Sequence, residues 1–176
     1  MPFLIAALGV LAAVYFFIMR ARNAAHLTTE LMDVANDVRL AARRFGFVRR
    51  GAEHPAESID DPNIALAALG TAFLELDDLP SKEQRIALTG ALARAGRVNT
   101  GDAEELLILG RWIMNECGGP AQAVPRLGKK LYKMQGAEGF QPLMDIVQGV
   151  ANAGSGDLSA KQREALDDLT RAFRLS

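Results

Sequence analysis

The sequence predicts an all-α protein that consists of a single N-terminal transmembrane helix followed by a compact bundle of about six to seven helices. Three observations predict this fold class. The chain begins with an apolar run that is long enough to cross a bilayer. Apolar residues then recur at spacings of three and four, and capping and helix-ending residues divide the remaining chain into segments of helix length.

The apolar run FLIAALGVLAAVYFFIM covers the seventeen residues 3–19 and ends at Arg20. As a helix it measures about 25 Å, close to the ~30 Å hydrocarbon core, and Arg20 and Arg22 can extend it because long basic side chains reach the headgroups. A cleaved signal peptide and a buried core helix are alternatives. However, basic residues follow the run instead of preceding it, and no face of the run is polar. We therefore expect residues 1–22 to be a transmembrane anchor.

The arginines predict the orientation of this anchor. Seven arginines lie between the run and residue 50, whereas only Met1 and Pro2 precede the run. Because basic residues are retained on the cytoplasmic side of a span, we expect a single-pass protein of the bacterial inner (cytoplasmic) membrane. Its N-terminus would lie outside and its C-terminal domain in the cytoplasm. The single cysteine, Cys117, agrees with a reducing compartment.

Small residues predict a packing face on the span. Ala6, Gly9 and Ala13 recur at helical spacing, and small residues so placed let another membrane helix approach closely. Alanine and glycine are also common in membrane helices in general, so this pattern fits either a packing face or an ordinary span.

The remaining chain is predicted to contain a juxtamembrane helix and loop over residues 23–61 and a helical bundle domain over 62–176. An apolar stripe from Leu27 to Phe45 indicates the juxtamembrane helix. The bundle helices are expected over residues 62–76, 82–96, 102–117, 125–135 and 142–153, and from residue 160 toward the C-terminus.

Two similar stretches open the second and the last of these bundle helices. DLPSKEQR (78–85) and DLSAKQR (157–163) each contain an S-x-x-Q capping box, formed by Ser81 and Gln84 in the first and by Ser159 and Gln162 in the second. Each stretch follows an alanine-rich helix that contains a glycine. The similarity indicates two related helix pairs, and the alternative is two ordinary capping boxes.

The net charge of −1 conceals a polarity along the chain, with +4 in residues 1–50, −7 in 51–105 and +2 in 106–176. One predicted helix carries a basic face that consists of Arg126, Lys129, Lys130 and Lys133. Together with Arg20 and Arg22, this face is the candidate surface for anionic lipid headgroups or an acidic partner. The alternative is a solvated face of a core helix.

The sequence contains no recognisable reaction centre, so we expect no catalytic, cofactor-binding or metal-binding residues, no cofactor and no small-molecule substrate. His26 and His54 have no second ligand at metal-binding spacing. The Gly128-Lys129-Lys130 triplet lacks the upstream glycine and the Ser/Thr of a phosphate loop. Nucleic acid is not an expected partner, since the chain is not basic overall and only 6% of it is aromatic.

Residues of about 60–175 resemble the tellurite-resistance TerB-like family, because a turn of an acidic residue, leucine and Ser or Pro opens a helix near both ends of this region. The best-matching stretch is IVQGVANAGSGDLSAKQREALDDLTRAFRL, residues 146–175. The resemblance implies a TerB-like bundle. In that family acidic residues of the turn are associated with divalent cations, but Ser155, Lys161 and Gln162 occupy three of the acidic positions here. The resemblance therefore does not imply a metal site in this chain.

These observations together predict a non-enzymatic single-span membrane protein that acts as an accessory or assembly subunit, or docking module, of a bacterial inner-membrane complex. Respiratory complexes are one candidate host. The expected partners are an integral membrane protein complex, bound through the span and the helical domain, and anionic lipid headgroups. The alternative is a membrane-anchored chaperone-like or stress-response adaptor, similar to tellurite-resistance proteins, that recruits soluble partners.

Overall fold

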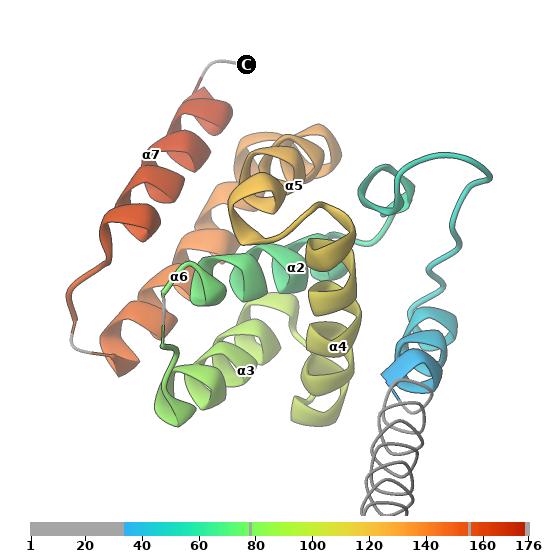
Figure 1. Cartoon of the computed structure of the whole chain (residues 1–176), viewed down its shortest axis with the longest axis horizontal. Helices are drawn as coiled ribbons and strands as arrows, with labels where there is room; N and C mark the ends of the chain where they lie inside the picture. The colour runs from blue at the N-terminus through green and yellow to red at the C-terminus, as the bar shows by residue number, and fades with distance from the viewer. Residues whose placement is uncertain (1–33, 78, 155, 175–176) are drawn as a thin grey trace, which may run out of the picture. The chain divides into compact units, whose positions relative to one another are not determined.

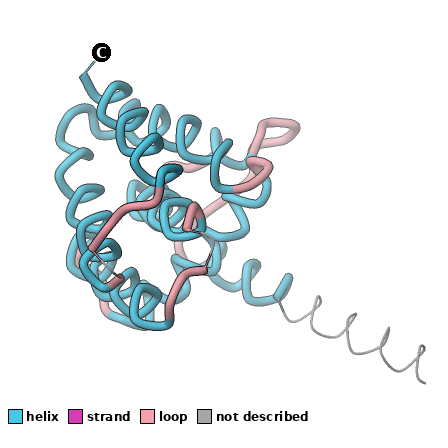
Figure 2. Tube along the Cα trace, turned by 60° about the vertical axis from the view of Figure 1, so that its left-hand side comes forward, coloured by secondary structure: helices cyan, strands magenta, loops and turns pink. Residues whose placement is uncertain are grey.

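The computed structural model describes residues 34–77, 79–154 and 156–174, and every regular element in these ranges is helical (Figure 1, Figure 2). The predicted all-α class is confirmed for these residues. The α-helices are α2 (Pro62–Glu75), α3 (Lys82–Gly96), α4 (Thr100–Glu116), α5 (Pro120–Gln135), α6 (Phe140–Ala153) and α7 (Ala160–Arg174). Two 3-10 turns, η1 (Pro55–Ser58) and η2 (Gly136–Gly139), precede α2 and α6, and residues 34–44 are also helical.

The predicted transmembrane run, its packing face and the two arginines that follow it lie outside the described residues. Among the helices that the structure does describe, none combines the length and the apolar character that a membrane span requires. The chain divides into two compact units, Met1–Asp37 and Val38–Ser176. The second unit contains α2 to α7 and the segment that leads to them.

Helix α2 forms the centre of the second unit and packs against α3, α4, α5 and α6 (Figure 1). Every residue from Ile64 to Leu74 is buried, as expected for a helix that is apolar on all faces. Asp61 caps the helix by accepting a 2.9 Å hydrogen bond from the Asn63 N–H, and Pro62 stands at the first helical position, so the helix begins at the predicted residue 62.

Close packing around α2 depends on small residues. A Cβ atom added to Gly110 of α4 would lie 2.7 Å from the backbone nitrogen of Ala68, so α4 crosses directly over the α2 backbone. A Cβ atom on Gly70 would similarly lie 2.7 Å from a methyl group of Leu88 in α3. These glycines let the helices approach at distances that a side chain would prevent.

Both predicted capping boxes are confirmed. Ser81 and Gln84 exchange hydrogen bonds of 2.8 and 3.1 Å, and Ser159 and Gln162 exchange bonds of 3.0 and 3.2 Å. The buried Gln162 amide also donates a 3.2 Å hydrogen bond to the Phe73 carbonyl near the end of α2. The cap of α7 is thereby joined to the end of the core helix.

Three predicted helix starts are wrong. Helix α5 begins at Pro120, because the Gly118-Gly119 turn has positive φ angles that end α4, and Pro120 can then occupy the first helical position. Pro125, the predicted start, lies inside the helix. Helix α4 begins at Thr100, since the Asn99 side chain accepts a 2.8 Å bond from the Asp102 N–H. Helix α6 begins at Phe140 and not at Pro142, because η2 leads directly into it.

Candidate binding surface

The amphipathic pattern of α5 places its basic residues on the surface. Leu127, Gly128 and Leu131 are buried. A Cβ atom added to Gly128 would lie 2.7 Å from a methyl group of Leu169 in α7, so α5 and α7 pack closely here. This packing fixes which side of the helix faces the core. The four cations on the other side are named here the basic surface: Arg126, Lys129, Lys130 and Lys133.

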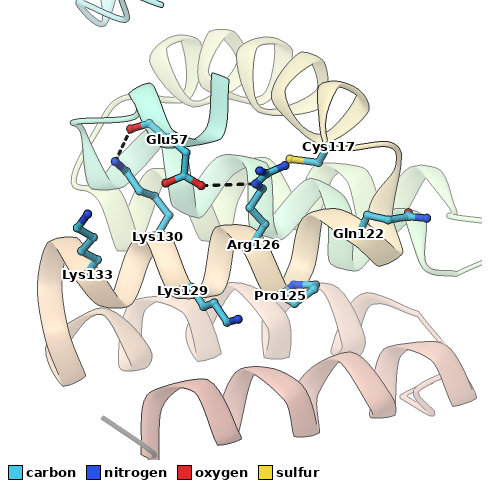
Figure 3. Close-up of a pocket in the computed structure, with 8 residues that line it drawn as sticks. All are labelled: Glu57, Cys117, Gln122, Pro125, Arg126, Lys129, Lys130 and Lys133. Carbon is cyan, nitrogen blue, oxygen red and sulfur yellow. Dashed lines mark hydrogen bonds and ion pairs between the residues drawn. The ribbon is translucent and has the colours of Figure 1, made fainter. Parts of the chain in front are cut away.

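The basic surface lines one open hollow of about 660 Å³ (Figure 3). The other lining residues are Glu57 from η1, Cys117 from the end of α4, and Gln122 and Pro125 from the first turns of α5. The structure therefore brings all four of the predicted basic residues of α5 together. Glu57 is the single acidic residue among those that line this hollow.

Glu57 holds η1 against α5. Its carboxylate lies 3.5 Å from Nε of Arg126, and its carbonyl oxygen accepts a 2.6 Å hydrogen bond from Nζ of Lys130. The ion pair is about half exposed on both sides, so it stabilises the fold by about 1 kcal/mol at most. Two of the four cations thus have partners within the chain.

The other two cations of the basic surface are not engaged. Lys129 and Lys133 are exposed, and neither makes an ion pair or side-chain hydrogen bond among the described residues. Figure 3 shows the Lys129 side chain pointing away from Glu57. Their ammonium groups are therefore available to an external anion.

Cys117 lines the hollow, next to the Arg126 guanidinium (Figure 3). Burial raises the pKa of its thiol above the ordinary value; the Arg126 charge lowers this pKa, and the carboxylates of Glu57 and Glu116 raise it. At neutral pH the sulfur is therefore a neutral thiol, which is a poor nucleophile. The Cys117 side chain is half-buried.

A second feature, which sequence reasoning missed, is the attachment of residues 44–58 along α4. We name this segment the strap. Arg44 pairs with Asp102 and with Glu105, at the start of α4. Farther along the strap, the ring of Phe47 packs edge-to-face against Trp112, with centroids 5.9 Å apart.

His54 makes the third attachment of the strap. Its Nδ1 accepts a 3.1 Å hydrogen bond from the Ala56 N–H, so the ring proton is on Nε2, which donates a 2.9 Å bond to the Glu116 carbonyl. The four α4 positions that the strap contacts, 102, 105, 112 and 116, share one helix face. The sequence did contain one signal for the strap: Phe47 lies in a predicted loop, and a large aromatic side chain there needs a packing partner.

No group of three or more His, Cys, Asp or Glu side chains that could hold a metal ion is present among residues 34–77, 79–154 and 156–174. Comparison of the whole chain with protein-family models, with curated proteins and with solved structures returned no match.

Proposed function

We propose that this chain is a membrane-anchored, non-enzymatic docking protein that serves as an accessory or assembly subunit of a bacterial inner-membrane complex. The span over residues 3–19 would place it in the membrane and pair with a helix of the partner through Ala6, Gly9 and Ala13. The helical domain would lie in the cytoplasm and contact the same complex. The observation that carries this proposal is the strap, because it fastens the chain that follows the apolar run directly onto the domain.

The attachment of the chain to the domain limits how far the domain can work from the membrane. Val38 packs against the core and Ala41 is buried in it, so only residues 20–37, named here the tether, separate the apolar run from the fixed part of the domain. These eighteen residues reach at most roughly 65 Å when fully extended and about 27 Å when helical. Three successive attachments at the other end of this tether support a domain that acts beside the bilayer, on a partner that shares the membrane.

A more specific fold assignment is part of this proposal. We infer that the helical domain is TerB-like, which the two matching capping boxes support, since both open the second helix of a pair. This resemblance favours the second candidate function, a stress-response or chaperone-like adaptor that recruits soluble proteins to the membrane. The two functions differ in their partners. An accessory subunit binds one complex in fixed stoichiometry, whereas an adaptor binds varied clients.

Purification of the tagged full chain in mild detergent, followed by quantitative mass spectrometry, tests the proposal. An accessory subunit is expected to co-purify with one membrane complex in a fixed ratio. A varied set of soluble proteins in low and unequal amounts would instead identify an adaptor. Recovery of the chain without any membrane protein would contradict docking altogether.

The Gly9→Leu variant sharpens this test, because a bulky residue on the packing face holds the helices apart and removes their close contact. We expect the yield of the partner to fall strongly, whereas Leu8→Ala on the opposite side is expected to leave it nearly unchanged. Both variants still insert, since leucine and alanine are tolerated in a span. An undiminished partner yield with Gly9→Leu would assign recognition to the helical domain alone.

A further inference from the structure

We propose that the basic surface of α5 binds the anionic headgroups of the phospholipid bilayer, so that the helical domain lies against the membrane through this helix. The inference rests on the proposed membrane anchor and adds the ligand class of the basic surface and the side of the domain that faces the lipid.

The charge distribution on α5 supports an anionic ligand. The four cations lie within residues 126–133, a length of about 10 Å along the helix. No acidic residue occurs between Glu116 and Glu138, so the helix itself offers these cations no counter-charge. The one acidic side chain of the hollow, Glu57, pairs with Arg126, and the Glu57 backbone carbonyl accepts the bond from Lys130, so no carboxylate among the described residues pairs with Lys129, Lys130 or Lys133.

The shape and chemistry of the surface favour a bilayer over a shaped ligand. The hollow is open, and its floor presents no set of buried polar groups that would fix one molecule in one orientation. Three of the four cations are lysines, whose flexible, strongly hydrated ammonium groups act as point charges and do not need the planar geometry that arginine recognises. Fluid headgroups, which change position constantly, suit such contacts.

An acidic protein could also bind this surface. Further cations between the apolar run and α2 favour lipid instead. Arg39, Arg43 and Arg49 are exposed on and next to the helix that leads from the apolar run into the strap. Basic residues beside a span lie in the negative potential of the anionic cytoplasmic leaflet, which strengthens binding about fivefold per cation near the surface. A tether of limited length keeps α5 at high effective concentration relative to those headgroups.

Electron paramagnetic resonance on the full chain in vesicles tests this proposal. A nitroxide is attached at Gln122→Cys in a Cys117→Ser background, because Gln122 is exposed and lines the hollow. The accessibility of the label to a water-soluble nickel relaxant is then measured in phosphatidylcholine vesicles with and without phosphatidylglycerol. We expect a severalfold loss of accessibility only when phosphatidylglycerol is present, and recovery at high salt because the attraction is screened.

Charge reversal at the two unengaged lysines provides the specific control. Lys129→Glu/Lys133→Glu is expected to abolish the protection of the label, and the milder Lys129→Gln/Lys133→Gln to reduce it. The matched variant Lys82→Glu/Arg94→Glu changes the charge equally on α3, which packs against α2, α4 and α6, and is expected to keep the protection. Thermal melting of each variant establishes that it is folded.

The outcomes separate this proposal from the proposed anchor. A chain that floats with vesicles but shows no protection with phosphatidylglycerol, or equal protection without it, would overturn lipid binding and leave the anchor intact. Protection that requires native membranes and is absent with phosphatidylglycerol would identify an acidic protein as the occupant and also overturn it. A chain that floats only with anionic vesicles would support the basic surface and contradict the span.

Discussion

Helices α2 and α5 share a first residue and are similar in length, but they serve different purposes. Each has proline at its first helical position, and they contain 14 and 16 residues. Helix α2 has no charged residue before Glu75 and is buried from Ile64 to Leu74, so all of its faces hold the fold together. Helix α5 buries one stripe and carries four cations on its other side, of which Arg126, Lys129 and Lys133 are exposed and Lys130 is half-buried. The comparison shows where substitutions should affect stability and where they should affect binding.

The largest expected effect is at the crossing of α4 over α2. Gly110→Ala adds a Cβ atom 2.7 Å from the Ala68 nitrogen and 2.8 Å from the Ala67 carbonyl carbon, both of which are backbone atoms that cannot rotate away. Overpacking of this kind costs roughly 3 kcal/mol, and the better helix propensity of alanine returns about 1 kcal/mol. We expect a net loss of about 2 kcal/mol in the free energy of unfolding, measured by urea denaturation.

Gly90→Ala in α3 is the matched control for this substitution. A Cβ atom at Gly90 would meet only the flexible end of the Arg94 side chain, at 3.4 Å. The gain in helix propensity should then dominate and raise the unfolding free energy by roughly 0.5–1 kcal/mol. Equal effects of the two substitutions would show that α4 does not cross α2 as closely as described.

A smaller effect is expected at the end of α2, where Gln162 joins the cap of α7 to the Phe73 carbonyl. In a continuing helix the Asp77 N–H would bond to Phe73, but it bonds to the Leu74 carbonyl instead. Gln162→Leu therefore leaves a buried carbonyl without its side-chain donor and should lower the unfolding free energy by about 1.5 kcal/mol.

Gln84→Leu, in the other capping box, is the comparison for this substitution. The Gln84 amide donates only a long, 3.4 Å bond to Asp77. Its loss should therefore cost less than that of Gln162, about 1 kcal/mol from the cap itself. A larger cost for Gln84→Leu in thermal or chemical denaturation would contradict this ranking.

The smallest effect on stability is expected on the exposed side of α5. Lys129→Glu/Lys133→Glu removes no ion pair or side-chain hydrogen bond among the described residues, so the unfolding free energy should change by no more than about 0.5 kcal/mol. Chemical denaturation of the variant and the unsubstituted chain checks this. A loss comparable to that of Gly110→Ala would mean that the basic surface holds the fold together and is not reserved for binding.

The sequence was sufficient where local chemistry determines structure. Asp61-Pro62 and the two S-x-x-Q boxes place three helix starts correctly, because a cap needs only neighbours in the chain. The same holds for the basic surface, since the spacing of Arg126, Lys129 and Lys133 within one helix determines their common face.

What the sequence could not supply depends on contacts between distant residues. Arg44 pairs with Asp102, 58 residues away, and His54 with Glu116, 62 residues away, and no local pattern links such positions. The role of Glu57 could not be foreseen either, because it becomes the counter-charge of the basic surface only when η1 packs on α5. Pro125 was misplaced as a helix start for a different, local reason: the Gly118-Gly119 turn and Pro120 begin the helix five residues earlier.

We propose that this chain is anchored in the membrane with its helical domain on the cytoplasmic side. Labelling of Glu53→Cys in a Cys117→Ser background tests this topology, because residue 53 is exposed in the strap. In intact cells a membrane-impermeant thiol reagent should not label this cysteine, labelling should follow permeabilisation, and the chain should remain in the membrane fraction after alkaline carbonate extraction. Efficient labelling in intact cells would contradict the cytoplasmic position of the domain, and release of the chain by carbonate would contradict the membrane anchor.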